Sequence, residues 1–310
     1  MRSRHLKAIF ALLALLFVAY VAVRALSGNG RASDGDRIAA AVRDGFSLVR
    51  VLPPEVTDSV RLEEVGGVWT VNGYPADSAL VRELADVLDS ARVGRLVAQS
   101  ATNHSRLGVS EDLARRIEIG PAGSPDAMFL LGGGGTDGRF VRFPGSDDVF
   151  AVPTASMRPF GRSVEDWRDS LVAAVDTASV TRITVRRNDQ PTPVLLMRDR
   201  GDATVWSLDG EPADSLGLAM LLQETAGLTA IGFPSDSVAF AVDFNDPVAV
   251  LEMFASDEPG AAPALSLLFV TAPDAREFLV RRADDPLAYR ISAVQAERLL
   301  PTRSMLLGDG

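Results

Sequence analysis

Residues 68–78 read Val-Trp-Thr-Val-Asn-Gly-Tyr-Pro-Ala-Asp-Ser, and residues 205–215 read Val-Trp-Ser-Leu-Asp-Gly-Glu-Pro-Ala-Asp-Ser. The two stretches lie 137 positions apart and agree in the pattern V-W-x-x-x-G-x-P-A-D-S. Agreement at so many positions with one constant offset indicates an internal repeat. The sequence therefore predicts two tandem copies of one folding unit.

Each copy starts with alternating apolar and polar residues, which is typical of a half-buried strand that here carries a tryptophan. An Asn-Gly or Asp-Gly turn follows, and the Pro-Ala-Asp segment predicts a helix start capped by the aspartate. We expect the tryptophans to be core residues; the alternative is that they stack on a sugar or peptide. The residues concerned are Trp69, Asn72, Gly73 and Asp77 in the first copy and Trp206, Asp209, Gly210 and Asp214 in the second.

Short alternating segments separated by turn residues follow each predicted helix and predict further strands. They cover residues 116–119, 127–131, 139–143 and 148–152 in the first copy, and 238–242, 248–254, 264–270, 276–281 and 288–291 in the second. The second copy ends in a capping box, Ser292 to Gln295, that opens a helix. Consecutive hairpins with a helix inserted after the tryptophan strand predict an α+β fold of two mainly antiparallel repeats.

The N-terminus predicts a membrane-spanning helix. Ala8 to Val23 contains no polar side chain other than the Tyr20 hydroxyl. As a helix, residues 6–26 extend about 31 Å, which matches a hydrocarbon core of about 30 Å. Arg2, Arg4 and Lys7 precede this segment, so we expect the N-terminus to stay in the cytoplasm.

Everything beyond residue 26 is then expected outside the cytoplasm, with 27 basic and 41 acidic residues and a net charge of −14. The sequence predicts a single-pass protein of the inner membrane with its body in the periplasm or outside. The alternative is a cleaved signal peptide, because Ala25-Leu26-Ser27 resembles a cleavage site.

These observations divide the chain into seven segments. We expect a cytoplasmic tail (1–5), a transmembrane helix (6–26), a stalk and linking helix (27–56), a first repeat (57–160), a connecting helix (161–176), a second repeat (177–301) and a tail (302–310). The linking helix is predicted from apolar spacing between Ile38 and Val49, and the connecting helix from Ser163-x-x-Asp166 before Trp167.

Composition excludes several classes of function. The chain has no cysteine, its histidines are His5 and His104, and its one lysine is Lys7. Thiol chemistry, thiolate metal sites and lysine catalysis in the body are therefore excluded. The net charge of −10 argues against a nucleic-acid partner, because phosphate binding depends on basic surface.

Four features resemble functional motifs, and a structural interpretation is favoured for each. Residues 133–138 match G-x-G-x-x-G, yet a strand-like segment follows, which predicts a hairpin loop. His104 lies in a polar stretch and is expected at the surface. Residues 243–246 could bind calcium weakly but lack the EF-hand pattern. The pairs Arg186-Arg187 and Arg281-Arg282 are expected at solvated strand edges. The sequence therefore predicts no catalytic, cofactor-binding or metal residues and no cofactor.

With these segments in view, the chain resembles the bacterial family called domain of unknown function 4340. The resemblance rests on the tryptophan strand before Pro-Ala-Asp, and on Arg106-Leu107-Gly108-Val109, Leu131-Gly132, Phe140-Val141-Arg142, Val149-Phe150-Ala151-Val152 and Trp167-Arg168-Asp169. It covers residues 57–175, and the second half only through the repeat. The resemblance implies a membrane span and no established activity. Some members are encoded beside ABC-type transport proteins similar to the gliding-motility system, which implies an accessory role.

We expect a membrane-anchored, extracytoplasmic, non-enzymatic binding protein that serves as an accessory subunit of an ABC-type permease and ATPase. One alternative is an envelope hydrolase, which needs two carboxylates about 5 to 10 Å apart in a cleft. Another is a sensor that binds a small ligand between the two repeats, in a pocket with polar lining.

Overall fold

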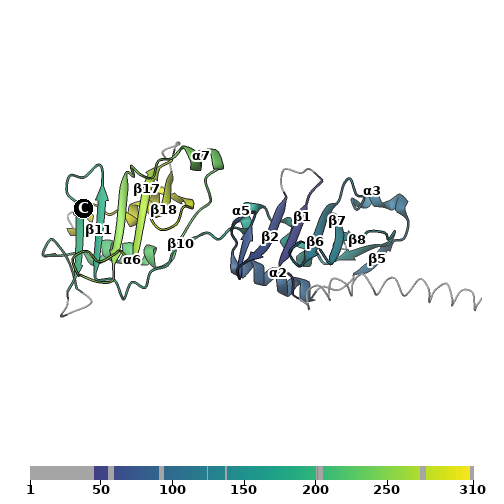
Figure 1. The fold of residues 1–310 in the computed structure, drawn as a ribbon, viewed down its shortest axis with the longest axis horizontal. Helices are drawn as coiled ribbons and strands as arrows, with labels where there is room; N and C mark the ends of the chain where they lie inside the picture. The colour runs from purple at the N-terminus through teal and green to yellow at the C-terminus, as the bar shows by residue number, and fades with distance from the viewer. Residues whose placement is uncertain are drawn as a thin grey trace, which may run out of the picture. The chain divides into compact units, whose positions relative to one another are not determined.

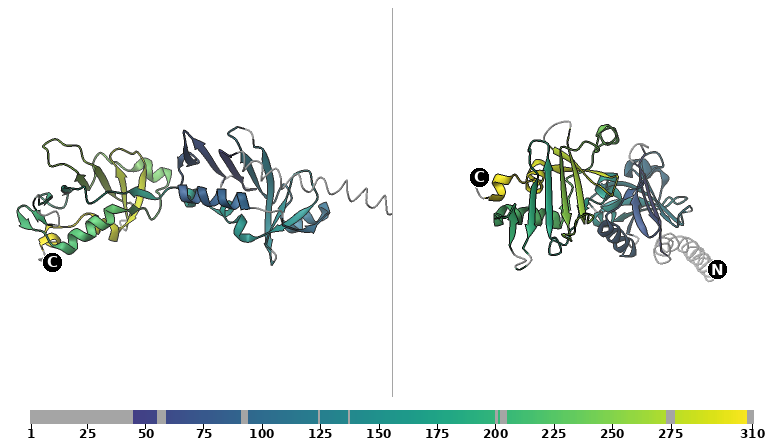
Figure 2. Two further views of the ribbon diagram at one scale, coloured as in Figure 1. Left: turned by 90° about the horizontal axis from the view of Figure 1, so that it is seen from below. Right: turned by 60° about the vertical axis from the view of Figure 1, so that its left-hand side comes forward.

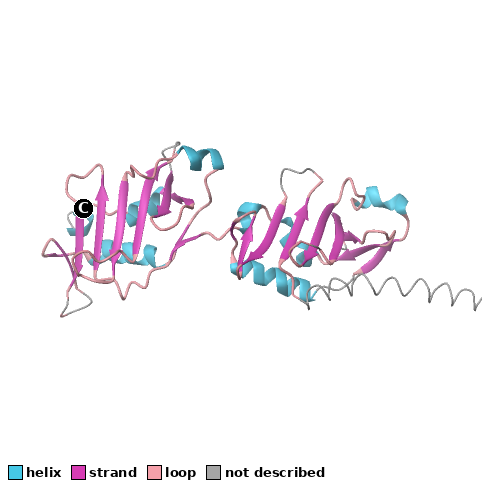
Figure 3. Cartoon of the chain, viewed as in Figure 1, coloured by secondary structure: helices cyan, strands magenta, loops and turns pink. Residues whose placement is uncertain are grey.

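The structure is a computed structural model that describes residues 45–54, 59–90, 94–123, 125–136, 138–199, 201, 205–272 and 277–307. The chain divides into two compact units between Asp169 and Ser170. Each unit is built on a large antiparallel sheet with helices packed on it, so the predicted α+β class is confirmed (Figure 3). The predicted transmembrane helix lies outside the described residues. Within them, no helix has both the length and the apolar character needed to cross a membrane.

The first unit contains a nine-stranded sheet in the order β4-β3-β2-β1-β6-β7-β8-β9-β5 (Figure 1). Its strands are β1 (Leu48–Leu52), β2 (Val60–Val65), β3 (Val68–Val71), β4 (Tyr74–Pro75), β5 (Arg95–Ala98), β6 (Arg115–Gly120), β7 (Ala127–Gly135), β8 (Gly138–Arg142) and β9 (Val149–Val152). Its helices are α2 (Ser78–Ser90), η2 (Ala101–Asn103), α3 (His104–Leu107), α4 (Thr154–Met157), η3 (Pro159–Gly161) and α5 (Val164–Trp167).

Most of the core of this unit lies on one face of the sheet. Successive residues of a strand point to opposite faces, and Phe150 of β9 points to the main core whereas Val149 points away from it. Helix α2 lies along the core face (Figure 2). The helical side chains buried there are Val81, Leu84 and Leu88 of α2, Phe160 of η3 and Trp167 of α5.

Helix α3 packs on the opposite face. Leu107 and Val109 form a small separate cluster with Val149. Gly132 of β7 permits this approach, because a Cβ atom built there would lie 2.6 Å from the carbonyl oxygen of Leu107. Gly132 at the glycine-rich end of β7 therefore leaves room for the backbone of Leu107, which packs directly against this strand.

The second unit contains an eight-stranded sheet in the order β14-β13-β12-β11-β16-β17-β18-β19, and a separate pair, β10–β15. Its strands are β10 (Leu171–Ala173), β11 (Arg182–Arg187), β12 (Val194–Arg198), β13 (Trp206–Leu208), β14 (Glu211–Pro212), β15 (Leu228–Thr229), β16 (Ala249–Phe254), β17 (Leu265–Thr271), β18 (Glu277–Arg282) and β19 (Ala288–Ser292). Its helices are α6 (Ser215–Ala226), α7 (Asp236–Ala241), α8 (Ala293–Leu299) and α9 (Arg303–Leu307).

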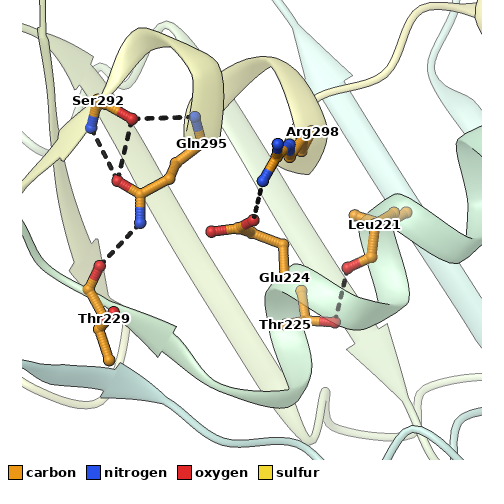
Figure 4. A network of polar contacts seen from close by, with 7 residues as sticks. All are labelled: Leu221, Glu224, Thr225, Thr229, Ser292, Gln295 and Arg298. Atoms are coloured by element: carbon orange, nitrogen blue, oxygen red, sulfur yellow. Dashed lines mark hydrogen bonds and ion pairs between the residues drawn. The ribbon is translucent and has the colours of Figure 1, made fainter.

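Helices α6, α8 and α9 cover the core face of this sheet, and α7 packs on the other face. The predicted capping box of α8 is present: Ser292 accepts from the backbone N–H of Gln295, and the Gln295 side chain accepts from the N–H of Ser292. The Gln295 amide also donates to the carbonyl of Thr229 at 2.8 Å, and Arg298 of α8 binds Glu224 of α6 at 3.3 Å (Figure 4). These contacts join α8 to α6 and to strand β15.

Three predicted helical or linker segments differ in the structure. Within the predicted stalk and linking helix (27–56), Leu48–Leu52 forms strand β1 in the middle of the first sheet. The predicted connecting helix (161–176) is one turn, α5, followed by strand β10, because Leu171–Ala173 pairs with β15. The predicted tail (302–310) contains α9, whose Leu306 is fully buried.

One predicted strand is also wrong. Residues 238–242 were expected in a strand of the second copy, and most of them belong to helix α7. Val238 of this helix and Val242, the residue that follows its last turn, both pack against the same small apolar cluster. The spacing of these two valines is therefore compatible with a strand or with a helix, and the apolar cluster that they contact determines which one forms.

Candidate functional site

The outer face of α6 is an exposed apolar surface. Leu218 and Leu221 of this helix are buried in the core, yet Leu216 and Met220 on the other side are 64% and 41% exposed. Met305 of the neighbouring helix α9 is also exposed. We call Leu216, Met220 and Met305 the α6–α9 surface. A surface helix of a globular protein is normally polar on its outer side, so the exposed apolar side of α6 is a candidate interaction surface.

The two helices of this surface are held together by their termini. Asp214 caps α6 by accepting from the N–H groups of Leu216 and Gly217, as predicted. The N–H of Asp214 donates to the carbonyl of Leu306 in α9 at 2.6 Å. Gly217 faces the backbone of Met305, and a Cβ atom there would lie 3.0 Å from the Met305 carbonyl oxygen. The surface is therefore presented by packed helices.

Helix α2 of the first unit follows its own tryptophan strand in the same way, and its outer face is charged. Arg82 and Asp86 are exposed, and Glu83 binds Arg162 at 2.6 Å. Asp77 caps α2 through the N–H groups of Ala79 and Leu80, as predicted. A helix in this setting can therefore carry a polar outer face, and the apolar face of α6 is not required by the fold.

A second feature is a cavity of about 370 Å³ in the first unit. It lies where β6, β7 and β8 meet the segment from α4 to η3. Arg115 of β6 is fixed there by its Nη1, which donates to the carbonyl of Phe160 at 2.5 Å. The lining residues are Arg115, Leu131, Arg139, Thr154, Ala155, Met157, Arg158 and Gly161. Local sequence patterns did not indicate this cavity, because its arginines come from three separate segments.

The second unit has a cavity of about 420 Å³ between its sheet and α8. Its lining includes two acidic residues, Asp189 and Glu297, and a pair of carboxylates in a cleft is what the hydrolase alternative requires. Arg187 binds Asp189 through Nε at 2.9 Å and through Nη2 at 2.7 Å. This pairing lowers the pKa of the Asp189 carboxyl group below its ordinary value. The general acid of a glycoside hydrolase needs a raised pKa, whereas the pKa of Asp189 is lowered. Asp189 is therefore not suited to that role.

His104 differs from the expectation of a surface residue. It is 8% exposed, begins α3, and its Nε2 lies 3.1 Å from the carbonyl oxygen of Asp147. A carbonyl only accepts, so Nε2 carries the proton and donates. The imidazole ties α3 to the turn before β9, which explains its burial.

The glycine-rich segment is a hairpin between β7 and β8, as predicted, because Gly135 pairs with Gly138. Gly138 has φ of +124°, and a Cβ there would lie 2.1 Å from the Val152 carbonyl oxygen. In the candidate calcium loop, the Asp243 side chain accepts from the backbone N–H of Asn245. Among the described residues, no three histidine or acidic side chains are grouped so as to hold a metal ion.

The predicted positions of the tryptophans and arginine pairs are corrected in part. Trp206 is 4% exposed and belongs to the core, as predicted. Trp69 is half-buried and packs against Phe46, with ring centroids 5.6 Å apart. The arginine pairs lie on β11 and β18, which have neighbours on both sides, so they are not at sheet edges. Their partners are Glu252 for Arg186, Asp189 for Arg187, the Phe244 ring for Arg281 and Asp284 for Arg282.

The fold and these sites define a two-unit α+β protein with an exposed apolar surface and an arginine-lined cavity. A family model described as Domain of unknown function (DUF4340) matches residues 69–238, which is more than half of the chain. The chain therefore belongs to this family, and the resemblance inferred from the motifs is confirmed. No curated protein and no solved structure matches the chain.

Proposed function

We propose that this chain is a membrane-anchored, extracytoplasmic accessory protein without catalytic activity, which binds a partner protein through the α6–α9 surface. The partner that fits the family resemblance is the permease and ATPase assembly of an ABC-type transport system. The observation that carries the proposal is the exposure of Leu216 and Met220 on a helix whose counterpart in the first unit has a charged outer face.

We further propose that the two units are copies of one ancestral domain. The sheet orders support this, since β4-β3-β2-β1-β6-β7-β8-β9 and β14-β13-β12-β11-β16-β17-β18-β19 follow the same plan. The pairing registers support it as well, and the corresponding cross-strand pairs are Val51–Val60 and Val185–Val194, Leu62–Val71 and Leu196–Leu208, and Val51–Ile117 and Val185–Leu251. All these residues are buried, so each copy uses the same positions for its core.

The anchor in this proposal is the apolar segment 6–26, with its basic residues on the cytoplasmic side. The chain should fractionate with membranes, resist carbonate extraction, and lose its body to protease added from outside. A soluble mature form that begins near Gly28 would instead support a cleaved signal peptide.

The net charge beyond residue 26 favours a protein as the occupant of the α6–α9 surface. A body with a net charge of −14 is repelled by anionic lipid and by a second copy of itself. An apolar segment of a different protein in the same membrane has neither disadvantage. Hydrophobic burial would then supply the affinity, with a few large side chains contributing most of it.

The absence of catalysis in this proposal is supported by the roles of the candidate groups. His104 donates to a backbone carbonyl, and the Asp189 carboxylate is bound by Arg187 in a bidentate manner. The glycine-rich segment is a hairpin. These three features thus have structural explanations in their own contacts.

The experiment is affinity purification from membranes after cross-linking, followed by mass spectrometry. We expect the wild-type chain to recover a permease and an ATPase, and the double variant Leu216→Ser/Met220→Ser to lose them. The matched control is Arg82→Ser/Asp86→Ser on the outer face of α2, which should retain both partners. Recovery of the bait alone, or equal recovery with both double variants, would contradict the proposal.

A further inference from the structure

The cavity of the first unit has an unusual charge. Three of its lining side chains are arginines, Arg115, Arg139 and Arg158, and none of its described lining residues is acidic. The Nε atom of Arg139 is buried and has no hydrogen-bond partner among the described residues. A buried donor without a partner gains free energy when an acceptor binds to it.

Three other arginines of the first unit that are at least half-buried each bind an acidic side chain. Arg50 binds Glu118 at 2.5 Å, Arg142 binds Glu111 at 3.1 Å, and Arg162 binds Glu83 at 2.6 Å. For Arg115, Arg139 and Arg158, no carboxylate of the described residues lies within ion-pair distance. The positive charge of the cavity is therefore left without compensation in this part of the chain.

The second unit indicates that the fold does not need these arginines. In the first unit Arg115 pairs with Leu131 and Arg139 pairs with Val152. If the units are copies, as proposed above, the register places Ala249, opposite Phe269, at the position of Arg115. It places Phe278, opposite Ile291, at the position of Arg139.

Ala249 and Phe278 line the second cavity, so both units form a hollow at the same corner of the sheet. The same corner is thus built with an alanine and a phenylalanine in one unit and with two arginines in the other. A merely structural role for the arginines does not explain this difference.

We propose that the cavity of the first unit binds a phosphate-bearing organic ligand. Guanidinium groups bind phosphate through paired, charge-assisted hydrogen bonds, and three of them match a doubly charged phosphate monoester better than a singly charged carboxylate. The Thr154 hydroxyl adds one donor. Leu131, Ala155 and Met157 provide an apolar wall for the organic part, which is the usual composition of a small-molecule site.

The test is calorimetric titration of the full chain in detergent with inorganic phosphate and with glycerol phosphate, and with acetate for comparison. We expect both phosphates to bind more tightly than acetate. Arg139→Gln and Arg158→Gln should each weaken phosphate binding by about tenfold, because each removes a charged hydrogen bond. Arg82→Gln, an exposed arginine of α2, is the charge-matched control and should bind like the wild type.

Two further measurements complete the test. Thermal melting followed by circular dichroism identifies the variants that remain folded. If Arg139→Gln unfolds, the Arg158→Gln variant, whose side chain is exposed, tests the phosphate site alone. Micelles containing phosphatidic acid, a lipid with a phosphate monoester headgroup, distinguish the source: competition with glycerol phosphate indicates a lipid headgroup, and no competition indicates a free ligand. Both outcomes support a phosphate site. Equal affinity of the wild type and the Arg139→Gln/Arg158→Gln variant, equal affinity for acetate, or no phosphate binding at millimolar concentration would overturn it.

Discussion

The backbone of Asn72 and the backbone of Asp209 adopt the same left-handed conformation, with φ of 48° and 52°. A glycine follows each of them, Gly73 with φ of 89° and Gly210 with φ of 92°. Two successive residues with positive φ form the tight turn that suits the twist of a β-hairpin. The turn thus joins β3 to β4 in the first unit and β13 to β14 in the second.

The side chains of these two turn residues bind different partners. The Asn72 Oδ1 accepts from the backbone N–H of Arg61 at 2.7 Å, and its Nδ2 donates to the carbonyl of Ser59 at 3.0 Å. Asp209 instead binds the guanidinium group of Arg303 on α9. The backbone conformation is common to both units, whereas the side-chain contacts are particular to each.

The first prediction concerns the glycines of these turns. Gly73→Ala and Gly210→Ala should each lower the free energy of unfolding by about 1 to 2 kcal/mol, because an L side chain disfavours positive φ. Neither position is crowded, since a Cβ there would meet nothing within 4 Å. Urea unfolding followed by circular dichroism measures the loss. Gly161→Ala, which has equal space and no positive φ, is the control. A similar loss in the control would show that conformation is not the cause.

The second prediction separates the two tryptophans. Trp206→Ala should cost about 3 to 5 kcal/mol, because Trp206 is buried in the core of the second unit. Trp69→Ala should cost less, about 1 to 3 kcal/mol, since Trp69 is half-buried against Phe46. Chemical denaturation monitored by circular dichroism gives both values. Equal losses for the two variants would mean that Trp69 has more packing partners than its exposure indicates.

The repeated motif was the most informative part of the sequence because its signals are local. A strand, a turn with positive φ and a capped helix start depend on neighbouring residues, so Trp206, Gly210 and Asp214 could be assigned in advance. The capping boxes at Ser163 and Ser292 were found for the same reason.

Elements that depend on distant partners were not predicted. Leu48–Leu52 pairs with β2 and with β6, and the pairing of Val51 with Ile117 has no local signature. Likewise, the burial of His104 depends on Asp147, and the arginine-lined cavity on strands that bring Arg115 and Arg139 to one corner. Sequence patterns report periodicity, whereas these features arise from tertiary pairing.

The third prediction is a pH dependence at the start of α5. The Asp166 carboxylate accepts from the backbone N–H of Ser163 at 2.9 Å and from its hydroxyl at 2.8 Å. The backbone bond is the main cause that lowers the Asp166 pKa, with the hydroxyl and the charge of Arg162 adding to it. The stabilisation is therefore fully present above the unfolded pKa of about 3.9, and is lost as the pH falls through the lower folded pKa.

Asp166→Asn tests this dependence. At pH 7 the variant should lose about 1 kcal/mol of unfolding free energy, the usual contribution of a helix cap. The difference from wild type should shrink as the pH falls below about 3.9, because the carboxylate is then protonated in the wild type as well. Asp86→Asn on the exposed face of α2 should stay within about 0.5 kcal/mol at every pH. A difference for Asp166→Asn that is constant with pH would contradict the assigned cause.

The last prediction concerns His104, whose structural role and possible chemical role have different consequences. His104→Ala should lower the free energy of unfolding by about 1 to 3 kcal/mol, because it leaves the Asp147 carbonyl without its donor and removes a buried ring. His104→Gln retains an amide N–H and should recover part of that loss. A structural role also predicts that both variants complement a deletion strain in proportion to the folded protein that accumulates in the membrane. Loss of complementation by a fully accumulated His104→Gln variant would instead indicate that the imidazole takes part in chemistry, and the non-enzymatic proposal would then fail.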